Sequence, residues 1–308
     1  MAYSTVLSAT FAGLDVIPVG VEADVSNGLP LLHMVGYLSS EVKEAAERVR
    51  TAIRNSHMDL PAKKIVVNLS PATVRKRGAS FDLPIALSIL ASLEEIPGEA
   101  LEETMVLGEM SLDGNIRKVS GILPAVLKAR DCGLKVCIVP KENEPEAALV
   151  EGIRIYGAKS LVGVCDYLKE PERVRKSLEL SGEGRLTYGE SQENERPLDY
   201  GDICGQKALK RAVEIAVAGG HNILFVGPPG SSKSMIVSRI PSILPPLTLE
   251  ESLEITKIYS ILGMVDEDHP LITSRPFRSV HHTITKAALI GGGAYPMPGE
   301  ISKAHGGV

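Results

Sequence analysis

The sequence predicts an α/β fold in both halves of the chain. Over the first 170 residues, short apolar runs rich in β-branched residues alternate with segments whose apolar residues recur at helical spacing. After residue 200, a helical pattern leads into a short apolar run, a glycine-containing loop and a second apolar segment, which is the order strand, loop and helix. The 308 residues, of which 44% are hydrophobic and 23% charged, suffice for two globular domains.

The elements of the N-terminal half are predicted from these patterns in order. Strands are expected at residues 16–25, 31–35, 65–67, 105–107 and 136–139. Helices are expected at residues 39–56, 81–93 and 122–129, with Ser39 or Ser40 as the first N-cap and Gly133 ending the third helix. One face of the first helix is apolar and consists of Val42, Ala45, Ala46, Val49, Ala52 and Ile53.

A polar, charged stretch separates the two halves. Residues 171–200 contain glycine, serine and glutamate with almost no apolar periodicity, which is typical of a linker. We therefore predict one domain over residues 1–170 and a second over residues 201–308. In the second domain, a helix is expected over 206–218, a strand over 223–226 and, after three prolines, a helix over 249–262.

The most informative motif is Gly227-Pro228-Pro229-Gly230-Ser231-Ser232-Lys233-Ser234. Small residues let backbone N–H groups approach a phosphate closely, so this segment predicts a P-loop that binds ATP and Mg²⁺. Lys233 is expected to reach the β- and γ-phosphates and the Ser234 hydroxyl to bind Mg²⁺. Ser232 occupies a position where the usual pattern has glycine, and its Cβ predicts either some strain in the loop or a slightly wider approach to phosphate.

Composition excludes several other classes of protein. The formal net charge of −5 gives no chain-wide positive field, so nucleic-acid binding would need a local patch or a ring of subunits. No apolar run reaches the roughly 20 residues of a membrane span, and no secretory signal is visible, so we expect a cytoplasmic protein without a membrane partner. The four cysteines, at positions 132, 137, 165 and 204, form no C-x-x-C pair and are expected to be reduced.

Several motifs follow one another in the second half. They are Asp202-Ile203-Cys204-Gly205-Gln206, Ala218-Gly219-Gly220-His221-Asn222, the P-loop, Arg275-Pro276-Phe277-Arg278, His281-His282-Thr283-Ile284, the segment 288–293 and Pro298-Gly299-Glu300-Ile301-Ser302. In this order they resemble the magnesium-chelatase-like AAA+ ATPases, nearest to the ComM/YifB subgroup. The resemblance implies ATP bound between the subunits of a ring, a hexamer by analogy. It also implies work on DNA, such as branch migration or unwinding in recombination or transformation.

The first half resembles the domain that these proteins share with Lon-type proteases. The similar segments are Gly108-Glu109-Met110-Ser111-Leu112-Asp113-Gly114 and residues 139–144. Lon proteases use a serine and a lysine, and the corresponding positions here are Ser80 and Leu123. Because a serine without a nearby base is a poor nucleophile, this Lon-like domain is expected to be non-proteolytic.

The resemblance also bears on hydrolysis. In the family, the acidic Walker B residues follow the position of Gly307 and Val308, where this sequence ends. The chain is therefore expected to be an N-terminal fragment that binds ATP but hydrolyses it negligibly, because no acidic pair polarises the attacking water.

Two other functions remain open from the sequence. One is a magnesium-chelatase-type ATPase that drives metal insertion or remodels a protein client. The other is a non-catalytic interaction module.

Three weaker signals have two interpretations each. Arg75-Lys76-Arg77 is either a solvated loop or a contact for nucleic-acid phosphates. His281 and His282 are expected to point to opposite faces, which argues against a shared metal. The loop 291–299, with Tyr295, resembles a loop that projects toward the ring pore, where tyrosine either stacks on bases or packs.

Overall fold

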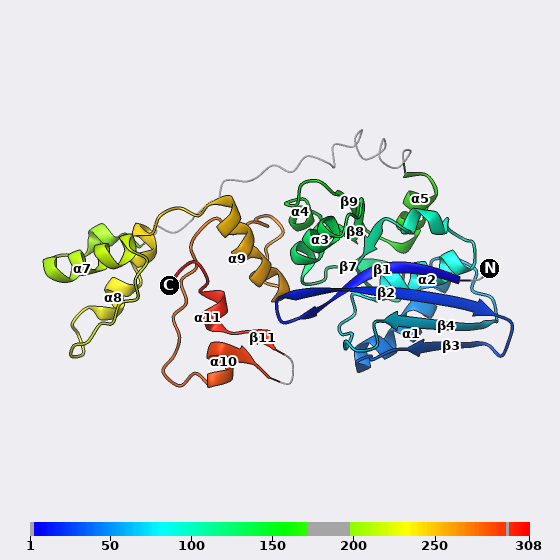
Figure 1. The fold of residues 1–308 in the computed structure, drawn as a ribbon, viewed down its shortest axis with the longest axis horizontal. Helices are drawn as coiled ribbons and strands as arrows, with labels where there is room; N and C mark the ends of the chain where they lie inside the picture. Colours follow the sequence, from blue (N-terminus) through cyan, green and yellow to red (C-terminus); the bar gives the residue numbers. More distant parts are fainter. Residues whose placement is uncertain (1–2, 172–197, 294–295) are drawn as a thin grey trace. The chain divides into compact units, whose positions relative to one another are not determined.

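The structure, a computed structural model, describes residues 3–171, 198–293 and 296–308 (Figure 1). These residues divide into two compact units, which are treated separately below. The first unit combines residues 3–171 with Ser260–Pro270, and the second combines residues 198–259 with Leu271–Val308. The predicted linker lies almost entirely outside the described residues, as does Tyr295, so both remain predictions.

A seven-stranded sheet forms the centre of the first unit, in the order β3-β4-β2-β1-β5-β8-β9 (Figure 1). β2 pairs antiparallel with β1 and β4, and the remaining neighbours pair in parallel. The strands are β1 (Tyr3–Ala12), β2 (Asp15–Ser26), β3 (Leu31–Val35), β4 (Lys64–Ser70), β5 (Thr104–Val106), β8 (Val136–Pro140) and β9 (Arg154–Ala158). This sheet confirms the predicted mixed α/β class.

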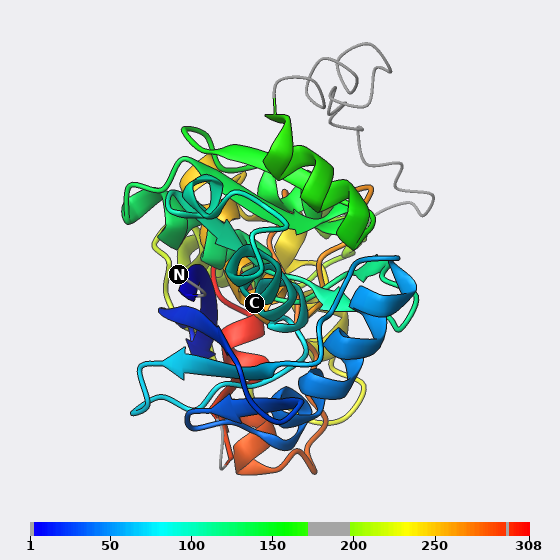
Figure 2. The same cartoon turned by 90° about the vertical axis from the view of Figure 1, so that its right-hand side faces the viewer.

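Five helices and a small hairpin complete the first unit. The helices are α1 (Ser40–Asn55), α2 (Asp82–Ser92), α3 (Ile122–Asp131), α4 (Glu144–Ala147) and α5 (Leu161–Lys169); β6 (Glu109–Met110) pairs with β7 (Ile116–Arg117). Helix α1 buries the apolar face that its spacing predicts and lies beside β3 (Figure 2). Helix α2 is buried along its whole length against β1, β2 and α1, so it is the central element of the core.

The second unit is built from short helices around a smaller core. Its elements are α7 (Lys207–Ala218), α8 (Lys233–Val237), α9 (Leu249–Ile261), α10 (Lys286–Ile290), β10 (Gly291–Gly292), β11 (Met297–Pro298) and α11 (Glu300–Lys303), with 3₁₀ turns at Tyr200–Asp202 and Ile240–Ile243. The core gathers Tyr200, Ile203, Val213, Ile236 and Ile240. The last two residues of α9 already belong to the first unit.

One predicted strand does not form. Residues 223–226 run as irregular backbone, and the side chains of Leu224 and Val226 are 86% and 88% exposed. A strand needs a neighbouring strand to pair its backbone N–H and C=O groups, and within the described residues none lies beside this segment. Local β-propensity alone is therefore not enough to form a strand at residues 223–226.

Strand β1 was not predicted because its inward-facing positions include polar residues. Ser4, Ser8 and Thr10 are buried together with Val6, so the sequence lacks the expected apolar alternation. Ser4 meets its hydrogen-bonding needs inside the core, since its hydroxyl donates to the Ser88 carbonyl at 2.5 Å and lies 3.1 Å from the Ser92 hydroxyl.

Within the described residues, no helix combines the length and apolarity that crossing a bilayer requires.

Candidate nucleotide site

The P-loop is an exposed turn that ends where α8 begins. Gly227–Gly230 are exposed, and Ser231, Ser232 and Lys233 are half-buried. Gly230 has φ +81° and Ser232 has φ +62°, both in the left-handed region. Ser232 thus adopts the conformation for which the usual motif uses glycine, and its Cβ costs about 1–2 kcal/mol there. The positive φ of Ser232 therefore confirms the expected strain in the loop.

The ammonium group of Lys233 lies against the loop itself. It donates to the carbonyl oxygens of Gly227 and Pro228, both at 2.8 Å, and to the Ser231 hydroxyl at 3.1 Å. The Ser231 hydroxyl in turn donates to the Pro228 carbonyl at 2.8 Å. All of these acceptors are neutral, so they hold the ammonium at the loop without neutralising its charge. An anionic group would form a stronger, charge-assisted hydrogen bond with the same ammonium.

The loop also offers backbone donors. Within the described part of the chain, the N–H groups of Gly230, Ser232, Lys233 and Ser234 have no hydrogen-bond partner. Unpaired amides are normal in the first turn of a helix, but Gly230 precedes that turn, so the loop extends the row of donors. A cavity of about 630 Å³ adjoins the loop and is lined by Phe225, Lys233, Ser234, Met235, Val237, Ser238, Phe277 and Ser279. This donor set fits a phosphate group, and the cavity provides room beside it.

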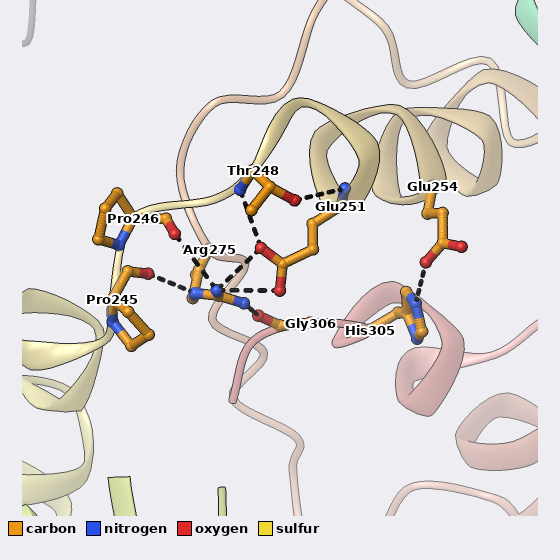
Figure 3. Close-up of polar contacts among 8 residues, drawn as sticks. All are labelled: Pro245, Pro246, Thr248, Glu251, Glu254, Arg275, His305 and Gly306. Carbon is orange, nitrogen blue, oxygen red and sulfur yellow. Dashed lines mark hydrogen bonds and ion pairs between the residues drawn. The ribbon is translucent and has the colours of Figure 1, made fainter. Parts of the chain in front are cut away.

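Arg275, from the Arg-Pro-Phe-Arg motif, connects three segments of the second unit (Figure 3). Its guanidinium donates to the carbonyl oxygens of Pro245 at 2.6 Å, Pro246 at 3.4 Å and Gly306 at 2.7 Å. It also forms a salt bridge with both carboxylate oxygens of Glu251, at 3.1 and 3.2 Å. The side chain of Arg275 is 12% exposed, whereas that of its partner Glu251 is 40% exposed.

Glu251 is fixed on its own helix as well. Its carboxylate accepts from the Thr248 N–H at 2.9 Å, and its N–H donates to the Thr248 hydroxyl at 3.2 Å, which is a capping box at the start of α9 (Figure 3). These contacts and the Arg275 salt bridge lower the pKa of Glu251. Arg275 therefore joins the turn that follows α8 to the first turn of α9.

Arg278, the second arginine of that motif, binds Glu300 at the start of α11. The Arg278 Nε to Glu300 Oε2 distance is 2.7 Å, and the Lys303 Nζ to Glu300 Oε1 distance is 2.9 Å. The two cations, Arg278 first, lower the pKa of Glu300 to about 2. Sequence reasoning used this motif for family resemblance only; its role in joining segments became visible with the structure.

The basic triplet is not a solvated loop as a whole. The side chain of Lys76 is 0% exposed, and its ammonium donates to the Pro71 carbonyl. Its backbone pairs with Tyr37 and Ser39, which fixes the loop against the end of β3. Burial lowers the pKa of Lys76. The sequence places three cations in a row, but packing removes the middle one from any surface contact with phosphate.

The histidine pair also differs from expectation. The rings of His281 and His282 lie together, with centroids 4.1 Å apart, because their segment is irregular and not an extended strand. His281 Nδ1 lies 2.7 Å from the Thr283 hydroxyl. Among the residues that the structure describes, no group of three or more histidine, cysteine or acidic side chains could bind a metal ion.

The position that corresponds to the Lon lysine is a leucine in this chain. Leu123 is fully buried at the start of α3, where its N–H donates to the Glu146 carboxylate at 3.0 Å. Ser80 is half-buried, and its carbonyl accepts from Gly108. Absence of proteolysis remains a prediction.

All four cysteines are free thiols, and burial raises the pKa of Cys137 and of Cys165 to about 12.

Comparison with known proteins places both halves in one family. The profile "Subunit ChlI of Mg-chelatase" matches residues 21–143, and "Magnesium chelatase, subunit ChlI" matches residues 199–308. The chain is 41% identical to YifB of Escherichia coli and 39% identical to competence protein ComM of Haemophilus influenzae, in each case over 308 residues that cover all of this chain and 59% of the relative.

A more distant match involves a Lon-type protease. Lon protease 2 of Bacillus subtilis is 30% identical over 130 residues, which cover 41% of this chain and 23% of the protease. This partial match supports a Lon-like domain in the chain. The chain spans about 60% of the length of the curated relatives that it matches over its whole length.

Proposed function

The chain belongs to the magnesium chelatase subunit ChlI family, in the subgroup that contains YifB and ComM, and on that premise we propose that it binds ATP with Mg²⁺ at residues Gly227–Ser234. Family membership makes it an AAA+-type protein, and such proteins use nucleotide and Mg²⁺ in general. The observation that carries the proposal is the P-loop itself, with Lys233 over the loop and a row of unpaired amides beside an open cavity.

Each loop residue has a distinct proposed role. Lys233 would exchange the carbonyls of Gly227 and Pro228 for the β- and γ-phosphates, because charge-assisted bonds to anions are stronger than bonds to neutral acceptors. The backbone from Gly230 to Ser232 would contact the phosphates through its N–H groups, and the Ser234 hydroxyl would bind Mg²⁺. Bound Mg²⁺ neutralises charge that develops on the phosphates.

The direct test is the affinity of this chain for a fluorescent ATP analogue. We expect Lys233→Ala to abolish most of the binding and Ser234→Ala to weaken its dependence on Mg²⁺. Lys286→Ala, which removes an exposed lysine outside the loop, is the matched control and should bind like the wild type. Equal affinity of the Lys233→Ala variant and the wild type would contradict the assignment.

We further propose that the protein, at the full length of its relatives, is an ATP-driven DNA motor that acts as a ring, a hexamer by analogy. The support is similarity over the whole chain to a relative named as a competence protein, together with the ring assembly that is general in this family. Branch migration or unwinding is the proposed activity. Stimulation of ATP hydrolysis by forked DNA, measured on the full-length protein with Lys233→Ala as the blank, tests it.

A second candidate is a magnesium-chelatase-type ATPase that drives metal insertion or remodels a protein client. The description of the matching family as a chelatase subunit favours it. Basal ATP hydrolysis that forked DNA leaves unchanged, but that a tetrapyrrole-binding or other protein partner stimulates, would select this candidate over the DNA motor.

A further inference from the structure

A short segment of the first unit, residues 118–121, is held in a fixed conformation and is called the strap here. The buried Asn143 side chain forms two hydrogen bonds with the backbone of Val119. The Val119 N–H donates to Asn143 Oδ1 at 2.9 Å, and Asn143 Nδ2 donates to the Val119 carbonyl at 3.0 Å. The Lys118 N–H donates to the Glu142 carboxylate at 3.2 Å. The side chains of Glu142 and Asn143 thus fix the conformation of the strap independently of its other contacts.

The strap contacts residues 260–270, which follow α9. The Gly121 N–H donates to the Ser260 carbonyl at 2.9 Å. The Lys118 ammonium donates to the Val265 carbonyl at 3.2 Å and pairs with Glu267 at 3.1 Å. Ile261 and Val265 are buried. This segment lies inside the sequence range of the second family match, yet it packs as part of the first unit.

Two features indicate that these contacts can open. The ion pair between Lys118 and Glu267 is substantially exposed, and such pairs contribute little. In addition, the Ser260 hydroxyl is buried with no hydrogen-bond partner among the described residues, whereas the Thr256 hydroxyl one turn earlier donates to the Ser252 carbonyl at 2.6 Å. An unpaired buried hydroxyl disfavours the closed state, because water would satisfy it on opening.

The other end of α9 is connected to the P-loop side of the second unit. Glu251, in the first turn, binds Arg275. The same guanidinium also donates to the carbonyls of Pro245 and Pro246 (Figure 3). These prolines follow the 3₁₀ turn at Ile240–Ile243, which comes directly after α8. A displacement of α8 would therefore reach the first turn of α9 through named contacts.

We propose that the strap and residues 260–270 form a reversible clasp through which nucleotide at the P-loop and the N-terminal unit influence each other. The proposal rests on the proposed nucleotide site, which supplies the signal. Opening the clasp frees the Ser260 carbonyl and hydroxyl and the Lys118 ammonium, and closing it fixes the end of α9. Because coupling is reciprocal, a clasp that nucleotide opens or closes must in turn change the affinity for nucleotide.

A disulfide across the clasp tests this coupling. A Cβ added at Gly263 would lie 3.6 Å from the Ser120 Cβ, which is within the range for a disulfide. The protein carries Ser120→Cys and Gly263→Cys in a background where the exposed Cys132 and Cys204 are replaced by serine. Because Gly263 has φ +66°, the Gly263→Cys single variant is a necessary control for strain.

The readouts are the dissociation constant of a fluorescent ATP analogue with the disulfide reduced and oxidised, and the rate of disulfide formation with and without that nucleotide. We expect the dissociation constant to change about fivefold or more on oxidation, and nucleotide to change the rate of crosslinking. Ratios within twofold in both measurements would show a static contact and overturn the proposal. Failure of the reduced protein to bind nucleotide would instead contradict the nucleotide site and, with it, the signal.

A second variant reads the opening of the clasp without nucleotide. Ser260→Ala removes the unpaired hydroxyl, so we expect slower hydrogen exchange of the peptide that contains the Gly121 amide, whose acceptor is the Ser260 carbonyl. Ser242→Ala, which removes a hydroxyl far from the strap in sequence and hydrogen-bonded within the second unit, is the comparison. Unchanged or faster exchange at Gly121 in Ser260→Ala would show that the hydroxyl does not oppose closure.

Discussion

The two units differ in how completely they bury their own apolar residues. In the first, α2 is buried along its whole length and seven strands pair with one another. In the second, Leu224 and Val226 directly precede the P-loop and are almost fully exposed. The first unit therefore contains the interactions that determine its fold, whereas the segment directly before the proposed nucleotide site leaves two large apolar side chains exposed.

The largest expected effect concerns a buried ion pair in the first unit. Arg48 binds both carboxylate oxygens of Asp82 at 2.9 Å, and the Asp82 side chain is fully buried. Arg48→Ala leaves that carboxylate without its partner and should cost about 3–5 kcal/mol of stability. Arg211→Ala, which breaks an exposed pair with Glu214 in the second unit, should cost about 0.2–0.5 kcal/mol.

Urea denaturation of both variants checks the contrast. Burial raises the pKa of Asp82, and Arg48 opposes that rise, so the pKa should be higher still in Arg48→Ala. A raised folded-state pKa means that the native state binds the extra proton, so the penalty of Arg48→Ala should shrink as the pH falls through that pKa. Equal penalties for the two arginine variants would remove the proposed difference between the units.

Core packing gives the next contrast. Leu87 lies in α2 with no exposed surface, so Leu87→Ala should cost about 2–5 kcal/mol through lost burial and the cavity left behind. Leu224→Ala removes the same atoms from an exposed side chain and should change stability by less than about 0.5 kcal/mol. Hydrogen exchange measured separately for peptides of each unit is the suitable readout, since a chain with two units need not unfold in one step. A large loss in Leu224→Ala would mean that another part of the protein covers it.

The same contrast explains which predictions from sequence succeeded. The apolar face of α1 matched residue for residue, because helical spacing is read within one segment. The strand at residues 223–226 was wrong and β1 was missed, because pairing partners and buried serines depend on residues far away in the sequence. The P-loop motif could be read from the sequence because its residues are contiguous, and nucleotide binding at this motif stays a prediction. The contacts of Arg275 could not be read in this way, because their partners lie in three segments that are separate in the sequence.

A smaller effect is expected from pH at Glu300 in the second unit. Its pKa of about 2 lies below the ordinary value of 4.5, because Arg278 and Lys303 favour the ionised form. The stabilisation is therefore fully present above about pH 4.5 and is lost as the pH falls toward 2. Glu300→Gln should lack this part of the pH dependence.

The measurement is the pH dependence of hydrogen exchange in the peptide that covers α11. The wild type should exceed Glu300→Gln in protection near neutral pH, and the two should converge toward pH 2. Glu254→Gln is the control, because its partner His305 lies 3.5 Å away and both side chains are about half exposed. A constant difference between wild type and Glu300→Gln across this range would show that the charge of Glu300 is not what connects Arg278 to α11.

The smallest expected effect lies in the P-loop and tests whether its unusual serine matters. Ser232→Gly relieves the left-handed strain but adds freedom to the unfolded chain, so stability should change by less than about 1 kcal/mol. Affinity for the ATP analogue should stay equal or rise, because the backbone already has the conformation that glycine favours. A clear loss of affinity would mean that the Ser232 hydroxyl itself contributes to binding. The site would then depend on a side chain where the usual motif uses only backbone.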